Sequence, residues 1–280
     1  MTSGILLTRW RVPRPGDLAR CREILARRPL RHCYLISRID RALAKRREDG
    51  RLLLLGEEEL AFFGDEGNLA VGDLSPAGRE SLVELVKSRF RGLGIAVSPR
   101  PEVEGLARGL RGETEPRLLR PQTLYGADRS RPVPPGAVLL RPRPADTPRV
   151  VKAALNLAVE DLGLPRLRLS RKRMEATVRK RIRQGRTFVL RHRGRVVFKV
   201  DLAVATDLGA LVEGVYTFPE LRGQGLAREG MAGLLQMLLA EYPRVSLHVD
   251  RSNAAARRAY ERAGMVEAGE LGLAIFKSWR

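Results

Sequence analysis

A strand, a glycine loop and a helix follow one another between residues 210 and 239. Pro219 cannot donate to a sheet ladder, so it marks the end of the apolar strand. Gly223 and Gly225 let the backbone come close to a ligand. Apolar side chains at helical spacing then predict a helix directly after the loop. Because the first amides of a helix are unpaired and its dipole favours negative charge, the sequence predicts a phosphate site at residues 222–227.

The spacing of this loop excludes two common phosphate loops. The dinucleotide fingerprint needs a third glycine, which is not in register, and the nucleoside triphosphate loop needs Gly-Lys-Ser/Thr, which is absent. Arg222-Gly-Gln-Gly-Leu-Ala227 instead resembles the Arg/Gln-x-x-Gly-x-Gly/Ala loop of the GNAT superfamily of N-acyltransferases. Downstream, residues 246–250 resemble the next strand of that family. Asn253 and residues 259–265 resemble its Asn…Tyr…Gly-Phe signature, with Met265 in place of Phe.

The resemblance implies that the chain uses acetyl-CoA as its acyl donor. In the family, the loop amides hold the coenzyme pyrophosphate and the preceding strand pairs with the pantetheine arm. A strand amide, here that of Val215, polarises the thioester carbonyl. The positions implied to contact the coenzyme are Val215, Tyr216, Thr217, Arg222, Gly223, Gln224, Gly225, Leu226, Ala227 and Asn253. Asn253 has a second interpretation, because an Asn that caps the following helix would look the same.

Two catalytic residues follow from the same resemblance. Tyr260 stands where the family places a tyrosine near the coenzyme sulfur, so it is expected to protonate the departing thiolate. The alternative for Tyr260 is a half-buried helix aromatic. Glu213, on the strand before the loop, is expected to take the proton of the amine, because an alkyl ammonium has a pKa near 10.4 and needs a proton route. Glu213 also fits a plain solvent-facing charge or a partner of a neighbouring Arg.

The composition limits the environment and the partners. The 280 residues carry a net charge of +20, yet lysine accounts for only seven of the 52 basic side chains, so arginine bias competes with an acidic partner as the explanation. The basic stretch 170–184 is the clearest case, where a positive rim would favour an acidic acceptor. Two cysteines and three scattered histidines form neither a disulfide framework nor a metal site. No run is long enough to span a membrane, and a cytoplasmic location is expected.

The elements that must position these residues predict an α/β fold with a mixed, mostly antiparallel sheet flanked by helices. We expect an N-terminal α/β domain at 1–128, a linker at 129–136 and a GNAT N-acetyltransferase domain at 137–280. Residues 17–30 are predicted to be helical, with a short strand or a helix end at 31–39. The first half resembles a second GNAT-like copy without the glycine loop, or else an unrelated α+β domain.

The function that follows is an acetyl-CoA-dependent N-acetyltransferase with an amine acceptor, either an acidic small molecule or a protein lysine. Two alternatives stay open. One is a coenzyme-binding regulatory protein that does not catalyse, and the other is an aminoacyl-tRNA-dependent transferase, which would make nucleic acid a partner. The sequence predicts no metal and no membrane partner, and it leaves the acceptor and a homodimeric assembly undecided.

Overall fold

The computed structural model describes residues 10–46, 49–89, 92–133, 137–163, 165–166 and 169–276. The described chain forms two compact units. Unit 1 contains residues 1–122 and 270–280, and unit 2 contains residues 123–269. Residues 134–136 of the predicted linker lie outside the described residues. So do residues 1–9 of the first predicted domain and residues 277–280 of the second.

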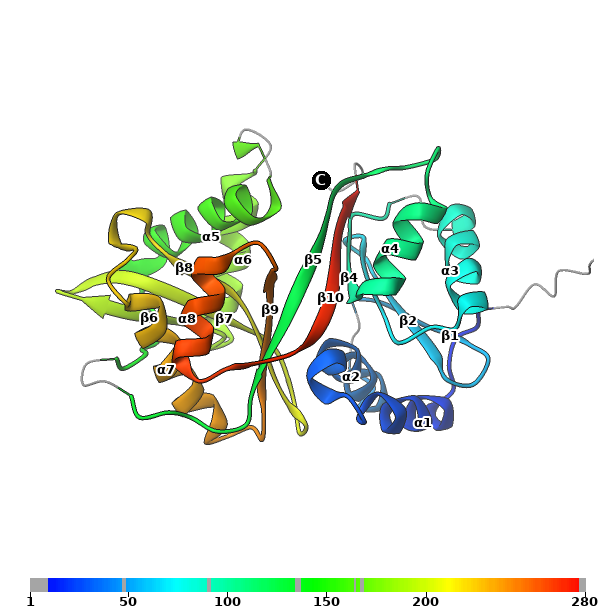
Figure 1. Cartoon of the computed structure of the whole chain (residues 1–280), viewed down its shortest axis with the longest axis horizontal. Coiled ribbons are helices and arrows are strands. Elements are labelled where there is room, and N and C mark those ends of the chain that lie inside the picture. The colour runs from blue at the N-terminus through cyan, green and yellow to red at the C-terminus, as the bar shows by residue number, and fades with distance from the viewer. Residues whose placement is uncertain are drawn as a thin grey trace, which may run out of the picture. The chain divides into compact units, whose positions relative to one another are not determined.

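Unit 1 begins with two helices and three short strands, after which single helices and strands alternate (Figure 1). Its elements are α1 (Pro15–Leu25), α2 (Pro29–Leu43), β1 (Gly50–Leu55), β2 (Glu59–Gly64), β3 (Asn68–Val71), α3 (Pro76–Arg89), β4 (Ile95–Pro99), α4 (Arg100–Gly109), the first part of β5 (Pro116–Ala127) and most of β10 (Val266–Phe276).

The sheet of unit 1 has the strand order β1-β2-β3-β4-β10. All neighbours are antiparallel except β3 and β4, which run parallel and pair only Asn68 with Ile95 and Leu69 with Ala96. Apolar side chains of α3 and α4 form one core with this sheet. On the other face, Tyr34 of α2 packs edge-on against Phe62 of β2, with ring centroids 6.0 Å apart.

Unit 2 contains the predicted glycine loop. Its elements are the second part of β5, η1 (Pro144–Asp146), α5 (Thr147–Leu162), α6 (Arg171–Arg183), β6 (Thr187–His192), β7 (Arg195–Thr206), β8 (Gly209–Thr217), η3 (Pro219–Leu221), α7 (Leu226–Leu239), β9 (Val245–Asp250), α8 (Ala254–Ala263) and the first part of β10.

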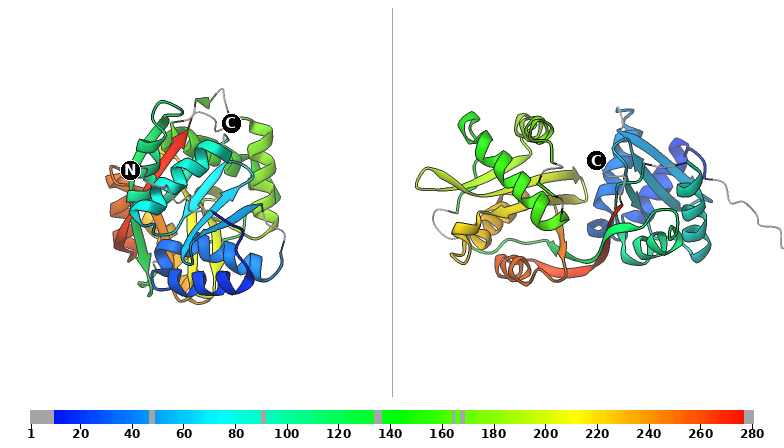
Figure 2. Two further views of the ribbon diagram at one scale, coloured as in Figure 1. Left: turned by 90° about the vertical axis from the view of Figure 1, so that its right-hand side faces the viewer. Right: turned by 90° about the horizontal axis from the view of Figure 1, so that it is seen from above.

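The sheet of unit 2 has the strand order β6-β7-β8-β9-β5 and a helix layer on each face. Antiparallel β6, β7 and β8 are followed by parallel β9. Helices α7 and α8 share one core with Val212 and Leu247, while α5 and α6 share another with Val196 and Tyr216. In the right-hand view of Figure 2, green α5 and α6 lie on one side of these strands and ochre to orange α7 and α8 on the other.

The two units repeat one order of elements, namely two helices, three strands, a helix, a strand, a helix and a strand. The repeat departs from a simple tandem at its last strand. Residues 123–127 of β5, which follows α4, belong to unit 2, whereas residues 271–275 of β10, which follows α8, pair with β4 of unit 1. Each unit is therefore completed by a strand from the other half of the sequence.

This exchange makes the units differ from the predicted domains. Their first boundary lies at 122/123 rather than 128/129, and residues 270–276 return to unit 1 rather than closing the domain predicted at 137–280. The predicted fold class is confirmed, because each unit has a mixed, mostly antiparallel sheet flanked by helices. No helix in the described residues combines the length and apolar character needed to cross a membrane.

Candidate active site

Strand β8 carries a β-bulge in the middle of its pairing with β7. Lys199 pairs with Tyr216 and Asp201 pairs with Glu213, so Gly214 and Val215 together face one residue of β7. Gly214 has φ +63°, a left-handed conformation that glycine adopts without strain. A Cβ there would meet the Lys199 Nζ and an Asp201 carboxylate oxygen at 2.8 Å. The bulge takes one residue of β8 out of the ladder, at the position predicted to polarise a thioester.

The parallel pairing of β8 with β9 is short. Ala210 pairs with Val245 and Leu211 with Ser246, and the recorded register ends there although β8 continues to Thr217. The second half of β8 therefore has no paired residue on β9 within the described strands. A gap between two central strands is where an extended ligand can add its own hydrogen bonds to the sheet.

The predicted glycine loop lies between η3 and α7 and is largely exposed. Gly223 and Gly225 have φ +79° and +80°, and a Cβ built on Gly223 would meet nothing within 4 Å. Gly225 occupies the N-cap of α7 and no side chain caps the helix. In the part of the chain that the structure describes, none of the backbone amides of residues 223–228 donates to a protein acceptor. Six successive free amides at a helix N-terminus form an anion-binding surface.

Arg222 is fixed beside this loop by a network that reaches α5. Its guanidinium donates to the Thr217 carbonyl at 3.1 Å and to Glu160 at 2.7 Å. The Tyr216 hydroxyl donates to the same Glu160 at 3.2 Å and accepts a hydrogen bond from Asn156 at 3.0 Å. The predicted coenzyme residue Tyr216 thus has a buried side chain that ties the strand to α5, and only its backbone remains for the ligand.

Glu213 is a partner of a neighbouring arginine, one of the alternatives that the sequence left open. Arg181 of α6 donates to Glu213 at 2.5 Å and to Asp201 at 3.0 Å. Asp201 also accepts from Thr187 at 2.8 Å and from the buried Lys199 amine. The Glu213 carboxylate therefore lies on the α6 face of the sheet, at the edge of a network of four charged groups.

His248 of β9 lies on the same face of the sheet as Glu213. Leu247 and Val249 contact the α7 and α8 core, so the alternating His248 points to the α5 and α6 side. Counting on from the pair Leu211–Ser246, His248 is in register with Glu213. Burial lowers the pKa of the His248 imidazole below its ordinary value, and the nearby Glu213 carboxylate acts in the opposite direction. Its alternation with apolar neighbours was a signal in the sequence, but strand spacing alone does not distinguish a catalytic from a structural histidine.

Tyr260 of α8 is 5% exposed and packs edge-on against Tyr125, with ring centroids 6.0 Å apart. Its hydroxyl has no hydrogen-bond partner within the described residues. Burial raises the pKa of the Tyr260 phenol well above its ordinary value, and the Asp161 carboxylate of α5 raises it further.

Asn253 is the N-cap of α8, and its side chain accepts a hydrogen bond from the Ala256 amide at 3.1 Å. This capping bond is the second interpretation that the sequence allowed. The residue is exposed, so its side-chain NH₂ group can still donate to a ligand.

Three features of unit 2 bear on acyl transfer from a thioester. A run of unpaired amides lies at the start of α7, a bulged strand lies beside a gap in the sheet, and a buried phenol comes from α8. Glu213 and His248 lie on the α6 face of the sheet.

A comparison with known families identifies the domain that contains these residues. Residues 151–265 match the model of the acetyltransferase (GNAT) family, which spans α5 to the end of α8 and includes the glycine loop. The predicted resemblance is therefore confirmed, and this segment is a GNAT acetyltransferase domain. Among curated proteins, no sequence matches the chain significantly.

Solved structures of the same fold extend over nearly the whole chain. A Drosophila protein aligns with a TM-score of 0.65 and 11% identity, covering 95% of this chain and 98% of its own. A GCN5-related N-acetyltransferase from Sphaerobacter thermophilus aligns with a TM-score of 0.56 and 17% identity over 95% and 94%. A GNAT-family acetyltransferase from Colwellia psychrerythraea aligns with a TM-score of 0.53 and 14% identity over 96% and 100%. These identities establish the shared fold.

Proposed function

We propose that the GNAT domain at residues 151–265 transfers an acetyl group from acetyl-CoA to an amine by direct attack on the thioester. The observation that carries the proposal is the run of six unpaired backbone amides at residues 223–228. Because the loop is largely exposed, water can solvate these amides in the free protein, and several of them can donate to one anion when a ligand replaces that water. The dipole of α7 favours a negative ligand. The pyrophosphate of coenzyme A has the charge and the acceptor oxygens to do so.

The strand geometry supports a position for the rest of the donor. The pantetheine arm carries amide groups that can pair with the unpaired half of β8, as an added strand would. The bulge at Gly214 and Val215 then supplies a backbone N–H, which we assign to Val215, for the thioester carbonyl. That hydrogen bond stabilises the negative charge that develops on the carbonyl oxygen in the transition state.

In the proposed reaction, the neutral amine attacks the carbonyl carbon, the new N–C bond forms, and the C–S bond breaks to release coenzyme A as a thiolate. The raised pKa of Tyr260 keeps its phenol protonated throughout the physiological range. A phenol is a weaker acid than a thiol, so Tyr260 first acts as a hydrogen-bond donor to the sulfur. Burial raises the pKa of the departing thiol as well as that of the phenol, so the Tyr260 hydrogen bond stabilises the thiolate while the C–S bond breaks, and a proton that Tyr260 gives to the sulfur is replaced from solvent.

We assign the proton of the amine to the Glu213 and His248 pair. Arg181 donates to a Glu213 carboxylate oxygen at 2.5 Å, so this oxygen already accepts a hydrogen bond. His248 has a lowered pKa and is neutral near pH 7, so it can accept a proton while Glu213 stabilises the imidazolium that forms. The finer assignment is therefore His248 as the proton acceptor and Glu213 as the group that orients and charges the site. The acceptor is an amine of a small molecule or a protein lysine.

Calorimetry with acetyl-CoA on two matched glycine variants tests this function. Gly223 and Gly194 both have positive φ, and a Cβ on either meets nothing within 4 Å, so Gly223→Asp and Gly194→Asp carry the same backbone strain and the same charge. Gly223→Asp places a carboxylate among the free amides and should abolish binding, while Gly194→Asp in the β6–β7 turn should bind like the wild type. The wild type should bind one coenzyme per chain. Equal binding by the two variants would remove the loop from the site, and two equivalent sites would contradict a single active domain.

A further inference from the structure

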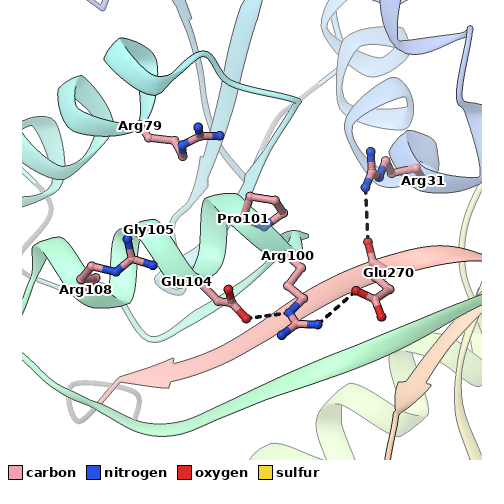
Figure 3. Close-up of a pocket in the computed structure, with 8 residues that line it drawn as sticks. All are labelled: Arg31, Arg79, Arg100, Pro101, Glu104, Gly105, Arg108 and Glu270. Carbon is pink, nitrogen blue, oxygen red and sulfur yellow. Dashed lines mark hydrogen bonds and ion pairs between the residues drawn. The ribbon is translucent and has the colours of Figure 1, made fainter.

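Unit 1 contains a pocket of its own, away from the glycine loop in sequence and built from three helices and one strand (Figure 3). Its volume is about 510 Å³, which lies within the range of small-molecule sites. Four arginines and two glutamates provide its charged lining, namely Arg31 of α2, Arg79 of α3, Arg100, Glu104 and Arg108 of α4, and Glu270 of β10. These side chains carry a net charge of +2.

Two of the arginines already have carboxylate partners. Arg100 donates to Glu104 at 2.6 Å and to Glu270 at 3.1 Å, and Arg31 donates to the Glu270 backbone carbonyl at 3.5 Å (Figure 3). Arg31 also donates to the Asp73 carboxylate at 3.0 Å. These contacts fix one wall of the pocket. The remaining cationic capacity lies on Arg79 and Arg108.

Arg79 and Arg108 are less fully paired than Arg31 and Arg100. Arg79 donates to the Leu74 carbonyl at 3.1 Å, and its one ion pair, with the Glu102 carboxylate, is long at 3.7 Å. The Arg108 side chain is exposed and forms no ion pair or hydrogen bond within the described residues.

Both arginines line the pocket along α4. A Cβ on Gly105 would lie 3.3 Å from the Arg79 Cδ, so the Arg79 side chain crosses α4 at that glycine. Arg108 is three residues further along the same helix, and residues at that spacing are neighbours on the helix surface. Arg79 also lies in the first turn of α3, and Arg100 begins α4, where positive charge opposes the helix dipole. An anion bound in the pocket near Arg79 and Arg100 offsets the repulsion between each arginine and the N-terminus of its helix.

We propose that this pocket binds a phosphate dianion, either free or as the monoester of a small metabolite. The charge of the lining matches a dianion, and guanidinium groups arriving from different helices match the several acceptor directions of a tetrahedral phosphate. The site is separate from the proposed coenzyme loop, because every lining residue belongs to unit 1. Unit 1 thus has a ligand-binding role whether or not unit 2 transfers acetyl groups.

Titration calorimetry with inorganic phosphate and with glycerol 3-phosphate, at constant ionic strength, tests the site on the full chain. Arg79→Gln/Arg108→Gln should weaken binding by at least about tenfold, because each charge-assisted hydrogen bond is worth about that factor or more. The control Arg51→Gln/Arg89→Gln removes the same charge from two exposed arginines of unit 1 outside the pocket and should change affinity by less than about twofold.

Two further variants keep the result decisive. Arg108→Gln alone removes a side chain without protein partners, so it should weaken binding with the fold intact even if the double variant unfolds. Gly223→Asp disrupts the other candidate phosphate site and should leave this affinity unchanged. Equal loss in the test and control pairs would indicate charge screening only and overturn the proposal. Loss in Gly223→Asp alone would assign the phosphate to unit 2 and also overturn it. Tighter binding of the ester than of free phosphate would identify a metabolite as the ligand, and the reverse would identify phosphate itself.

Discussion

The end of β3 and the segment after it in unit 1 correspond to β8 and the segment after it in unit 2, yet the backbone amides differ in their hydrogen bonding. In unit 1, side chains accept from them: Ser98 accepts from the Val71 amide at 2.9 Å and Glu102 from the Leu74 amide at 2.9 Å. Ser75 then caps α3 by accepting from the Gly78 amide at 3.0 Å. In unit 2, the amides of residues 223–228 have no acceptor among the described residues.

The register makes the comparison residue by residue. Aligning the pair Leu69–Ala96 with the pair Leu211–Ser246 places Ser98 at the position of His248. The same alignment places Val71 at the position of Glu213. In unit 1 the Ser98 hydroxyl therefore bridges β3 and β4 at the position that corresponds to the unpaired stretch between β8 and β9 in unit 2.

The connections to the following helix differ in length as well. Four residues, 72–75, join β3 to α3, whereas eight residues, 218–225, join β8 to α7. The longer connection has room for two glycines in the left-handed region, and the shorter one has a capping serine instead. The comparison shows that two units can share one order of elements and still differ at the start of the corresponding helix. In unit 1 a few side chains accept hydrogen bonds from the backbone amides that an anion would otherwise bind. The predicted GNAT-like copy without a coenzyme loop is consistent with this arrangement.

The largest expected effect comes from Tyr260, whose counterpart as the seventh residue of α4 is the apolar Leu106. Tyr260→Phe gives unit 2 the apolar character of unit 1 at this point, and it should lower kcat by about 10²-fold, the low end for general acid catalysis. The affinity for acetyl-CoA should stay within about twofold, because the hydroxyl is used mainly in the transition state. Steady-state kinetics with an amine acceptor found by screening measures kcat, and calorimetry measures the affinity.

Tyr125→Phe is the matched control for this loss. The Tyr125 hydroxyl donates to Glu261 at 2.6 Å, so its removal should lower stability but leave kcat near the wild-type value. A similar kcat for the wild type and Tyr260→Phe would mean that water or another group protonates the thiolate.

The next effect concerns His248, which has Ser98 as its counterpart. His248→Ser should lower kcat/KM by about tenfold, less than Tyr260→Phe, because Glu213 remains nearby as a weaker proton acceptor. Protonated histidine cannot accept a proton, so wild-type kcat/KM should rise with pH through the lowered pKa of His248 and then level off. The pH profile of the variant should lack that rise. An unchanged profile in His248→Ser would return the role of base to Glu213.

The sequence predicted unit 2 better than unit 1 because its signals are local. Gly223 and Gly225 both have positive φ. Ser170 caps the helix that follows it, by accepting a hydrogen bond from the Arg173 amide at 3.3 Å. Arg193 and Gly194 form the turn between β6 and β7. Each of these residues determines its own backbone within a few positions. The family signature added the order of elements and the place of Tyr260.

The parts that the sequence did not predict depend on contacts distant in the chain. One open choice did have a local signal: residues 31–39, predicted as either a short strand or a helix end, lie inside α2, and Pro29 at its first turn and the spacing of Leu35, Ile36 and Ile39 favour a helix. The exchange of β5 and β10 leaves no sequence signal, since an apolar strand looks the same whichever sheet it joins. The basic pocket of unit 1 is assembled from four separate elements, so no local motif marks it.

A smaller effect is expected from Glu102, the side chain that satisfies the loop amide of unit 1. Glu102→Ala leaves the Leu74 amide without its acceptor and should lower the free energy of unfolding by about 1 kcal/mol, measured by urea denaturation. Coenzyme stoichiometry should stay at one per chain, because unit 1 still lacks the glycine loop. A second coenzyme site in this variant would show that the Glu102 side chain alone prevents unit 1 from binding coenzyme.

Glu102 also gives stability a defined dependence on pH. Its folded pKa is raised by burial, so the folded chain binds more protons than the unfolded chain between the ordinary value of about 4.5 and the raised value. This group therefore stabilises the fold at low pH, and that contribution is lost as the pH rises through this window. Glu102→Gln keeps an acceptor for the Leu74 amide and should remove this part of the pH dependence. An identical slope in wild type and variant would contradict the assignment.

The smallest effect is expected from α6, the counterpart of α2. Six side chains of α2 are buried, whereas Val178 is the single residue of α6 that is buried, and the exposed face of α6 is basic. Glu175 holds Arg179 at 2.7 Å, but Lys180 and Arg183 have no ion pair within the described residues. If these charges attract an acidic acceptor, kcat/KM should fall severalfold as salt shortens the Debye length from about 10 Å at 0.1 M to about 3 Å at 1 M. Lys180→Glu/Arg183→Glu should flatten that slope, and Arg51→Glu/Arg89→Glu in unit 1 should leave it unchanged. If both pairs changed the salt dependence of kcat/KM equally, the basic face of α6 would have no specific role in attracting the acceptor.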